Sequence, residues 1–132
     1  PQSRLPCLVD EHCWVRGHLN SLAQALENIL RNAIRHSPAE GIVSLDGRRE
    51  GNMWHLWLDD QGGGVAPEEL ERIFAPFTRL DGSRPGDGGF GLGLSIARNA
   101  LRLQGGSLWA ENHGQGLRVH IRLPARQKPP SP

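Results

Sequence analysis

The stretch that decides the fold is Gly86-Asp-Gly-Gly-Phe-Gly-Leu-Gly-Leu-Ser95, in which five of the first eight residues are glycine. Apolar residues continue from it at helical spacing, so we expect a helix that ends near Gln104. The glycines leave backbone N–H groups bare at the start of this helix, where the aligned peptide dipoles favour negative charge. Glycine also loses more conformational freedom on ordering than any other residue. The stretch therefore predicts a mobile phosphate-binding lid, although the glycines alone are equally consistent with a plain flexible connection.

Composition limits the classes of protein to consider. The chain has 132 residues, of which 15 are basic and 14 acidic, giving a net charge of +1. This length suits one domain with a core of ordinary size, and the charge balance gives no reason to expect a nucleic-acid partner. We find no apolar run long enough for a membrane span and no signal-peptide pattern, so we expect a soluble domain. Two cysteines are too few for a disulfide scaffold, which favours a reducing compartment.

A first helix is predicted from Leu19 to about His36. Its apolar residues recur at helical spacing, and Pro38 closes the pattern after about four turns. One border of the apolar stripe carries four polar side chains, namely Asn28, Asn32, Arg35 and His36. Asparagine is a mediocre helix former, so two of them one turn apart need a reason. Either the amides bond each other at the surface, or they offer oxygen to a hard cation while Arg35 and His36 meet phosphate.

Two strands follow, at residues 41–48 and 53–60, joined by a tight turn. Because side chains alternate along a strand, Asp60 ends the second strand on the same face as its leucines. A carboxylate that faces an apolar interior is unfavourable unless it is paired or hydrogen-bonded. Gly62 and Gly64 come directly afterwards and let the backbone approach whatever this acid binds. The pattern predicts that Asp60 accepts a hydrogen bond from an exocyclic amine of a purine.

The second half of the chain supplies further elements. A short helix is predicted from Pro67 through Ile73. Phe74 and Phe77 follow it, and they suit either plain core packing or a hinge on which the lid rests. We expect the lid itself, roughly residues 79–90, to be poorly ordered without a ligand.

A final hairpin is predicted from strands at 107–111 and 117–123, around a loop at 112–116. Along the second of these strands, alternation predicts one buried face and one wet face, with His120 on the wet face. Residues 125–132 form a Pro-rich tail that we expect to be disordered.

Four motifs in this order carry a resemblance. They are Asn28-x-x-x-Asn32-Ala33, Asp60-x-Gly62-x-Gly64, Ile73-Phe74-x-x-Phe77 and Gly89-x-Gly91-x-Gly93. Together they resemble the N, G1, F and G2 boxes of the catalytic ATP-binding domain of two-component sensor histidine kinases, within the wider ATPase group of gyrase, Hsp90 and MutL. The resemblance covers nearly the whole chain, and four ordered boxes are far more specific than one. They favour the phosphate-binding interpretation of the glycine stretch.

The resemblance implies a fold and its domain limits. The fold would be α/β, a two-layer sandwich of the Bergerat type, in which helices cover one face of a mixed, mostly antiparallel sheet and a flexible lid closes over ATP. The catalytic ATP-binding domain would occupy residues 1–124, followed by the tail at 125–132.

The resemblance also implies residue roles, with ATP and Mg²⁺ as cofactors. Asn32 would bind Mg²⁺ through its amide oxygen, Asn28 would support the metal or its waters, and these two with Arg35 would form the catalytic set. His36 would also reach the phosphates, and Asp60 would accept from the adenine amino group. The other nucleotide-binding positions would be Gly62, Gly64, Phe77, Gly89, Gly91, Leu92, Gly93 and Leu94.

Departures from the family pattern refine the function. Asn28 stands where gyrase-like ATPases have the glutamate that activates water, which favours a kinase over a hydrolase. Leu117 stands where a threonine is common, which would weaken nucleotide affinity. None of the six histidines has the setting of the family's phosphoacceptor, so we expect that residue on another domain.

The implied function is therefore transfer of the ATP γ-phosphoryl group to a histidine on a separate helical dimerisation domain, for relay to a response regulator. We expect the isolated domain to be a cytoplasmic monomer without a nucleic-acid partner, and its parent to be a homodimer in the bacterial inner membrane. Two alternatives stay open: an ATPase that drives a conformational clamp, which would hydrolyse ATP steadily, and a non-catalytic module whose glycine loop docks onto protein.

Overall fold

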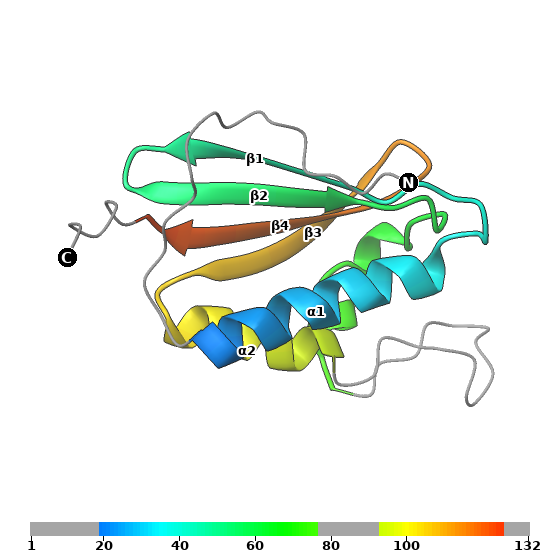
Figure 1. The fold of residues 1–132 in the computed structure, drawn as a ribbon. Helices are drawn as coiled ribbons and strands as arrows, with labels where there is room; N and C mark the ends of the chain where they lie inside the picture. The colour runs from blue at the N-terminus through cyan, green and yellow to red at the C-terminus, as the bar shows by residue number, and fades with distance from the viewer. Residues whose placement is uncertain (1–18, 77–92, 126–132) are drawn as a thin grey trace.

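The structure is a computed structural model that describes residues 19–76 and 93–125. Its elements are α1 (Leu19–His36), β1 (Ser44–Glu50), β2 (Met53–Asp59), the 3₁₀ turns η1 (Pro67–Glu69) and η2 (Arg72–Phe74), α2 (Gly93–Leu103), β3 (Ser107–His113) and β4 (Gly116–Pro124). The strands form one antiparallel sheet in the order β1-β2-β4-β3. Both helices lie on the same side of this sheet, as Figure 1 shows. The two-layer α/β sandwich is thus confirmed, and every described strand pair is antiparallel.

α1 packs on the sheet through a stripe at helical spacing. Leu22, Ala25, Ile29 and Ala33 are all buried in the core. The helix has 18 residues, about five turns, and its bounds are those expected from the sequence. Other apolar residues of this helix are not buried. Leu26, Leu30 and Ile34 are 39%, 45% and 59% exposed. They lie on the flank turned away from the buried stripe, which is too narrow to include them.

The inner face of the sheet provides the other half of the core. Leu58 of β2 and four alternate residues of β4 are buried; the latter are Leu117, Val119, Ile121 and Leu123. β2 and β4 are neighbours at the centre of the sheet, with Leu58 opposite Val119. The end of β2 is therefore held from both sides, and that is the position from which Asp60 extends.

Several strand limits differ from those expected by one to three residues. β1 begins at Ser44 because residues 38–41 form a turn, in which the Gly41 N–H donates to the Pro38 carbonyl over 2.8 Å. The last hairpin has a turn of only two residues, Gly114 and Gln115, with Gly114 at φ +58°. A positive φ at this position suits the tight turns that join antiparallel strands, so β3 and β4 extend further than the sequence indicated.

The short helix expected from Pro67 to Ile73 is wrong as one element. The chain forms two separate 3₁₀ turns, and the buried Glu69 carboxylate accepts two hydrogen bonds from Arg72, at 2.7 and 2.9 Å. The ring of Phe74 is buried in the core, and the Arg98 guanidinium of α2 lies 4.5 Å from the ring centroid.

His120 corrects the expected wet face of β4. It is only 7% exposed, because it stacks on Trp109 at 4.9 Å between ring centroids. Its Nδ1 lies 2.8 Å from His55 Nε2, and its Nε2 lies 2.5 Å from a Glu111 carboxylate oxygen. Bulky rings on neighbouring strands thus shield a residue that alternation places on the outer face.

The expected lid at 79–90 lies outside the described residues, as do residues 126–132 of the expected tail. Ala125 is described, and its N–H donates to the Asn52 carbonyl over 2.8 Å. Neither helix in residues 19–76 and 93–125 has the length and apolar character needed to cross a bilayer.

Candidate functional site

Asp60 is held in a fixed orientation just beyond the end of β2. It is 6% exposed, and its Oδ1 accepts hydrogen bonds from the N–H groups of Gly62 (2.9 Å) and Leu117 (3.1 Å). Its own N–H donates to the Leu117 carbonyl over 3.1 Å. These hydrogen bonds offset the cost of burying a carboxylate. Within the described part of the chain, no hydrogen bond reaches the other carboxylate oxygen, Oδ2. The second oxygen is therefore available to accept from a ligand.

Two glycines allow this arrangement. A Cβ on Gly116 would lie 2.0 Å from the Asp60 carbonyl oxygen and 2.6 Å from Oδ1, so no other residue fits beside the acid. A Cβ on Gly62 would lie 2.3 Å from the His36 carbonyl oxygen. Gly62 thereby packs the loop after β2 against the last turn of α1. The structure thus brings the loop after Asp60 next to His36, although the sequence places them far apart.

The four polar side chains along the border of α1 differ in their exposure to solvent. Asn32 is 8% exposed, Asn28 and His36 are half-buried, and Arg35 is exposed. Among the described residues no hydrogen bond reaches the carboxamide of Asn32. A buried amide without a protein partner is unfavourable, so it suits a position where its oxygen binds a ligand or a cation. No group of three or more His, Cys, Asp or Glu side chains in the described segments is arranged to hold a metal ion.

The start of α2 lies beside this border. α2 begins at Gly93, where a Cβ would lie 3.8 Å from the Cβ of Asn28, and Leu94 is fully buried. The first N–H groups of a helix have no partner within the helix, and the peptide dipoles make this end positive. The start of α2 thus lies next to Asn28 of α1. The other expected phosphate-side residues, Gly89, Gly91 and Leu92, and also Phe77, lie outside the described residues.

His36 contributes hydrogen-bonding capacity more than charge. Its pKa is lowered from 6.5, mainly because burial disfavours the charged ring and further because Arg35 is adjacent; Asp60 acts in the opposite direction. At neutral pH the imidazole is therefore neutral. The positive charge on this part of α1 comes from Arg35.

This lowered pKa predicts a pH dependence of stability. The unfolded chain binds a proton at His36 more readily than the folded chain, so the free energy of unfolding should decrease as pH falls below about 6.5. Denaturant unfolding at pH 7.5 and 5.5 measures this slope, which should be smaller in His36→Gln. The same substitution at exposed His113 serves as the control. An unchanged slope in His36→Gln would contradict the assigned environment.

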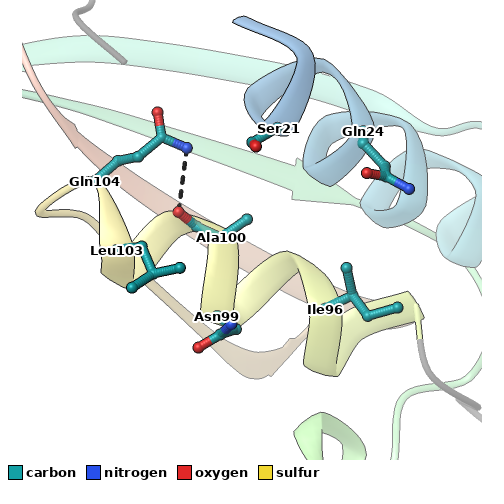
Figure 2. Close-up of a pocket in the computed structure, with 7 residues that line it drawn as sticks. All are labelled: Ser21, Gln24, Ile96, Asn99, Ala100, Leu103 and Gln104. Atoms are coloured by element: carbon teal, nitrogen blue, oxygen red, sulfur yellow. Dashed lines mark hydrogen bonds between the residues drawn. The ribbon is translucent and has the colours of Figure 1, made fainter. Parts of the chain in front are cut away.

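One groove lies away from these residues. It has a volume of about 490 Å³ and lies between α1 and α2. Its lining consists of Ser21, Gln24, Ile96, Asn99, Ala100, Leu103 and Gln104, as Figure 2 shows. None of the expected site residues lines it. A smaller pocket of about 240 Å³ lies at the end of the sheet and includes Asp60, Gln61 and the β3–β4 turn. The chemistry of the buried acid therefore points to the end of the sheet.

Sequence reasoning missed several residues that support Asp60. Gly116 gives it room, and Ser37 Oγ accepts from the N–H of Gln61 over 3.2 Å. Asn112 bonds the backbone of Val65. Glycine and asparagine are both common in turns. Nothing in the sequence therefore distinguishes these two residues from ordinary turn residues.

Comparison with known proteins identifies the family. The sequence model of the family described as histidine kinase-, DNA gyrase B- and HSP90-like ATPase matches residues 17–127. Sensor protein PfeS of Pseudomonas aeruginosa is 63% identical over 123 residues, which cover 93% of this chain and 27% of that protein. Sensor histidine kinase CpxA of Escherichia coli K12 is 43% identical over 110 residues, covering 82% and 24%. The chain thus spans about a quarter of the length of these relatives.

Solved structures show the same fold. The mycobacterial sensor histidine kinase MprB superposes with a TM-score of 0.75 at 32% identity, covering 86% of this chain and 78% of that one. The catalytic domain of histidine kinase ThkA gives a TM-score of 0.71 at 26% identity, covering 83% and 70%. The family model matches most of this chain, and one relative is 63% identical to it. The chain therefore belongs to the histidine kinase-, DNA gyrase B- and HSP90-like ATPase family.

Proposed function

We propose that this chain is the ATP-binding catalytic module of a sensor histidine kinase. It would transfer the γ-phosphoryl group of ATP to a histidine on a separate helical dimerisation domain, for relay to a response regulator. The observation that carries the proposal is Asp60, a buried carboxylate whose Oδ1 is bonded by two N–H groups and whose Oδ2 lacks a described partner. Such an acid suits the amino group of adenine, and the helix start near Asn28 suits phosphate.

The residues divide by the part of ATP that they would hold. Asp60 accepts from the adenine amino group, and Gly62 and Gly64 let the base approach the backbone. Arg35 supplies positive charge to the phosphates, and neutral His36 supplies a hydrogen bond. The N–H groups at the start of α2, at Gly93 and Leu94, complete the phosphate site together with Gly89, Gly91 and Leu92, while Phe77 supports the lid.

The donor set fits Mg²⁺. This ion prefers oxygen, keeps several waters, and is bound through a small number of protein groups plus substrate phosphates. The buried carboxamide of Asn32 offers one such oxygen, and Asn28, one turn earlier, supports it. When bound, the ion neutralises charge on the phosphates. Asn32 and Asn28 contribute by holding and orienting, and Arg35 stabilises charge that develops on the transferred group.

The same residues favour a kinase over a hydrolase. Hydrolysis needs a group that activates water next to the phosphates. The described side chains of the α1 border are two amides, a guanidinium and a neutral imidazole, and we place Asp60 at the base end, away from the phosphates. Glu27, the acid nearest in sequence to Asn28, is exposed and pairs with Arg31 over 2.6 Å.

For the parent protein we propose a homodimer in the bacterial inner membrane, with this module in the cytoplasm. Support comes from the relatives, which are sensor proteins about four times as long as the matched segment. The phosphoacceptor histidine would lie in the part of the parent that the module does not include.

Calorimetry with a non-hydrolysable ATP analogue tests the proposal. We expect binding that tightens when Mg²⁺ is added, with little phosphate release from ATP by the isolated chain, and phosphoryl transfer when a dimerisation domain of a related kinase is supplied. Absence of binding heat would support a docking module instead. Steady ATP hydrolysis would support an ATPase clamp.

A further inference from the structure

The loop that follows Asp60 needs support from elsewhere in the chain. Gly63 and Gly64 have φ values of +89° and +72°, a conformation that glycine adopts freely. Fixing a glycine in one conformation, however, costs conformational entropy. The loop belongs to no helix or strand. One anchor is backbone to backbone, since the Gly63 N–H donates to the Gln115 carbonyl over 2.9 Å. This places the tip of the β3–β4 hairpin against the loop.

Asn112, near the end of β3, supplies a second anchor with its side chain. Its Oδ1 accepts from the Val65 N–H at 2.9 Å, and its Nδ2 donates to the Val65 carbonyl at 2.7 Å. One carboxamide thus satisfies both backbone groups of a single residue, as a neighbouring strand would. An aspartate cannot donate, and an alanine can do neither.

The fit around this carboxamide is close. A Cβ on Gly64 would lie 2.4 Å from Asn112 Oδ1, so the loop approaches the amide as nearly as a glycine permits. Asn112 is also the cross-strand partner of Leu117, whose N–H donates to Asp60 Oδ1. A single rung of the β3–β4 ladder therefore holds both the acid and the far end of the glycine loop.

We propose that Asn112 is a positioning residue for the base-binding end of the site. It fixes the backbone of residues 62–65 at the distance from Asp60 that a purine ring requires, without touching the nucleotide. This inference rests on the proposed nucleotide-binding function and deepens it. It assigns to the β3–β4 hairpin a role in base recognition, whereas the phosphate end depends on α1 and α2.

The test compares adenosine binding by the wild type and by variants of Asn112. Asn112→Ala removes two neutral hydrogen bonds, so we expect about a tenfold loss of affinity for adenosine and for a Mg²⁺-ATP analogue alike. Asn112→Asp keeps the acceptor and should lose about threefold. Since the side chain is exposed, neither change leaves a core cavity. Asn52→Ala, an exposed asparagine in the β1–β2 turn, is the matched control and should bind normally.

Two further readouts separate positioning from plain stabilisation. Amide hydrogen exchange of Val65 should accelerate in Asn112→Ala without ligand, and the thermal midpoint of unfolding reports general stability. A lower midpoint with adenosine affinity within twofold of wild type would overturn the proposal while leaving the proposed function intact. If the wild type itself bound no nucleotide, both the function and this role would be overturned.

Discussion

Asn32→Ala is expected to lower the rate of phosphoryl transfer by about a thousandfold and to remove the Mg²⁺-dependent part of ATP affinity. The amide oxygen is the protein ligand that we propose for the ion, and alanine offers no oxygen. Adenosine affinity should be unchanged, because the base end of the site does not involve this residue. Calorimetry with and without Mg²⁺, together with transfer assays, measures both effects.

The same substitution has an unusual expected effect on folding. Asn32 is buried and its carboxamide has no hydrogen bond from the described residues, so removing it should leave the ligand-free domain equally stable or more stable. Loss of function without loss of stability would separate binding from structure. Asn20→Ala, on the exposed face of the same helix, is the control. Mg²⁺ dependence that survives in Asn32→Ala would exclude this residue as a ligand.

Asp60→Asn is expected to lower ATP affinity by about a hundredfold, as the loss of a hydrogen bond to a charged group predicts. The amide oxygen would take the place of Oδ1 and keep the bonds from Gly62 and Leu117. Its NH₂ group would then face the adenine amino group, donor against donor. Guanine carries an acceptor at that position, so the preference for ATP over GTP should disappear or reverse.

Competition between ATP and GTP analogues measures this change. Asp59→Asn is the matched control, because the neighbouring acid lies on the other face of β2 and accepts from Arg118 at 2.7 and 2.9 Å. That variant should keep its preference for adenine. If Asp60→Asn also kept it, the role of Asp60 as the reader of the base would be wrong.

Features that depend on local periodicity could be predicted from the sequence. The spacing of apolar residues predicted α1. Alternation along β2 predicted that Asp60 faces the buried side, and the structure confirms this with an exposure of 6%. Both depend on residues a few positions apart. The four ordered motifs then identified the family, because their spacing is more specific than any one of them.

Features that depend on distant parts of the chain could not be predicted. Asn112 meets Val65 across 47 positions, and Gly116 meets Asp60 across the β2–β4 pairing, so their roles follow only from register. His120 is buried by rings on two other strands, which alternation along its own strand does not reveal. The exposed flank of α1 could not be predicted either. The sequence shows which residues are apolar, but it does not show how much of the helix surface the rest of the protein covers.

The place of β1 in the sheet has a consequence for solubility at high concentration. β1 is an edge strand among those described, and edge strands carry backbone groups on which other chains can assemble into aggregates. Four of its seven residues are charged, which disfavours such assembly. Replacing Arg48 and Arg49 with valine would make this edge strand apolar and more prone to assemble into fibrils.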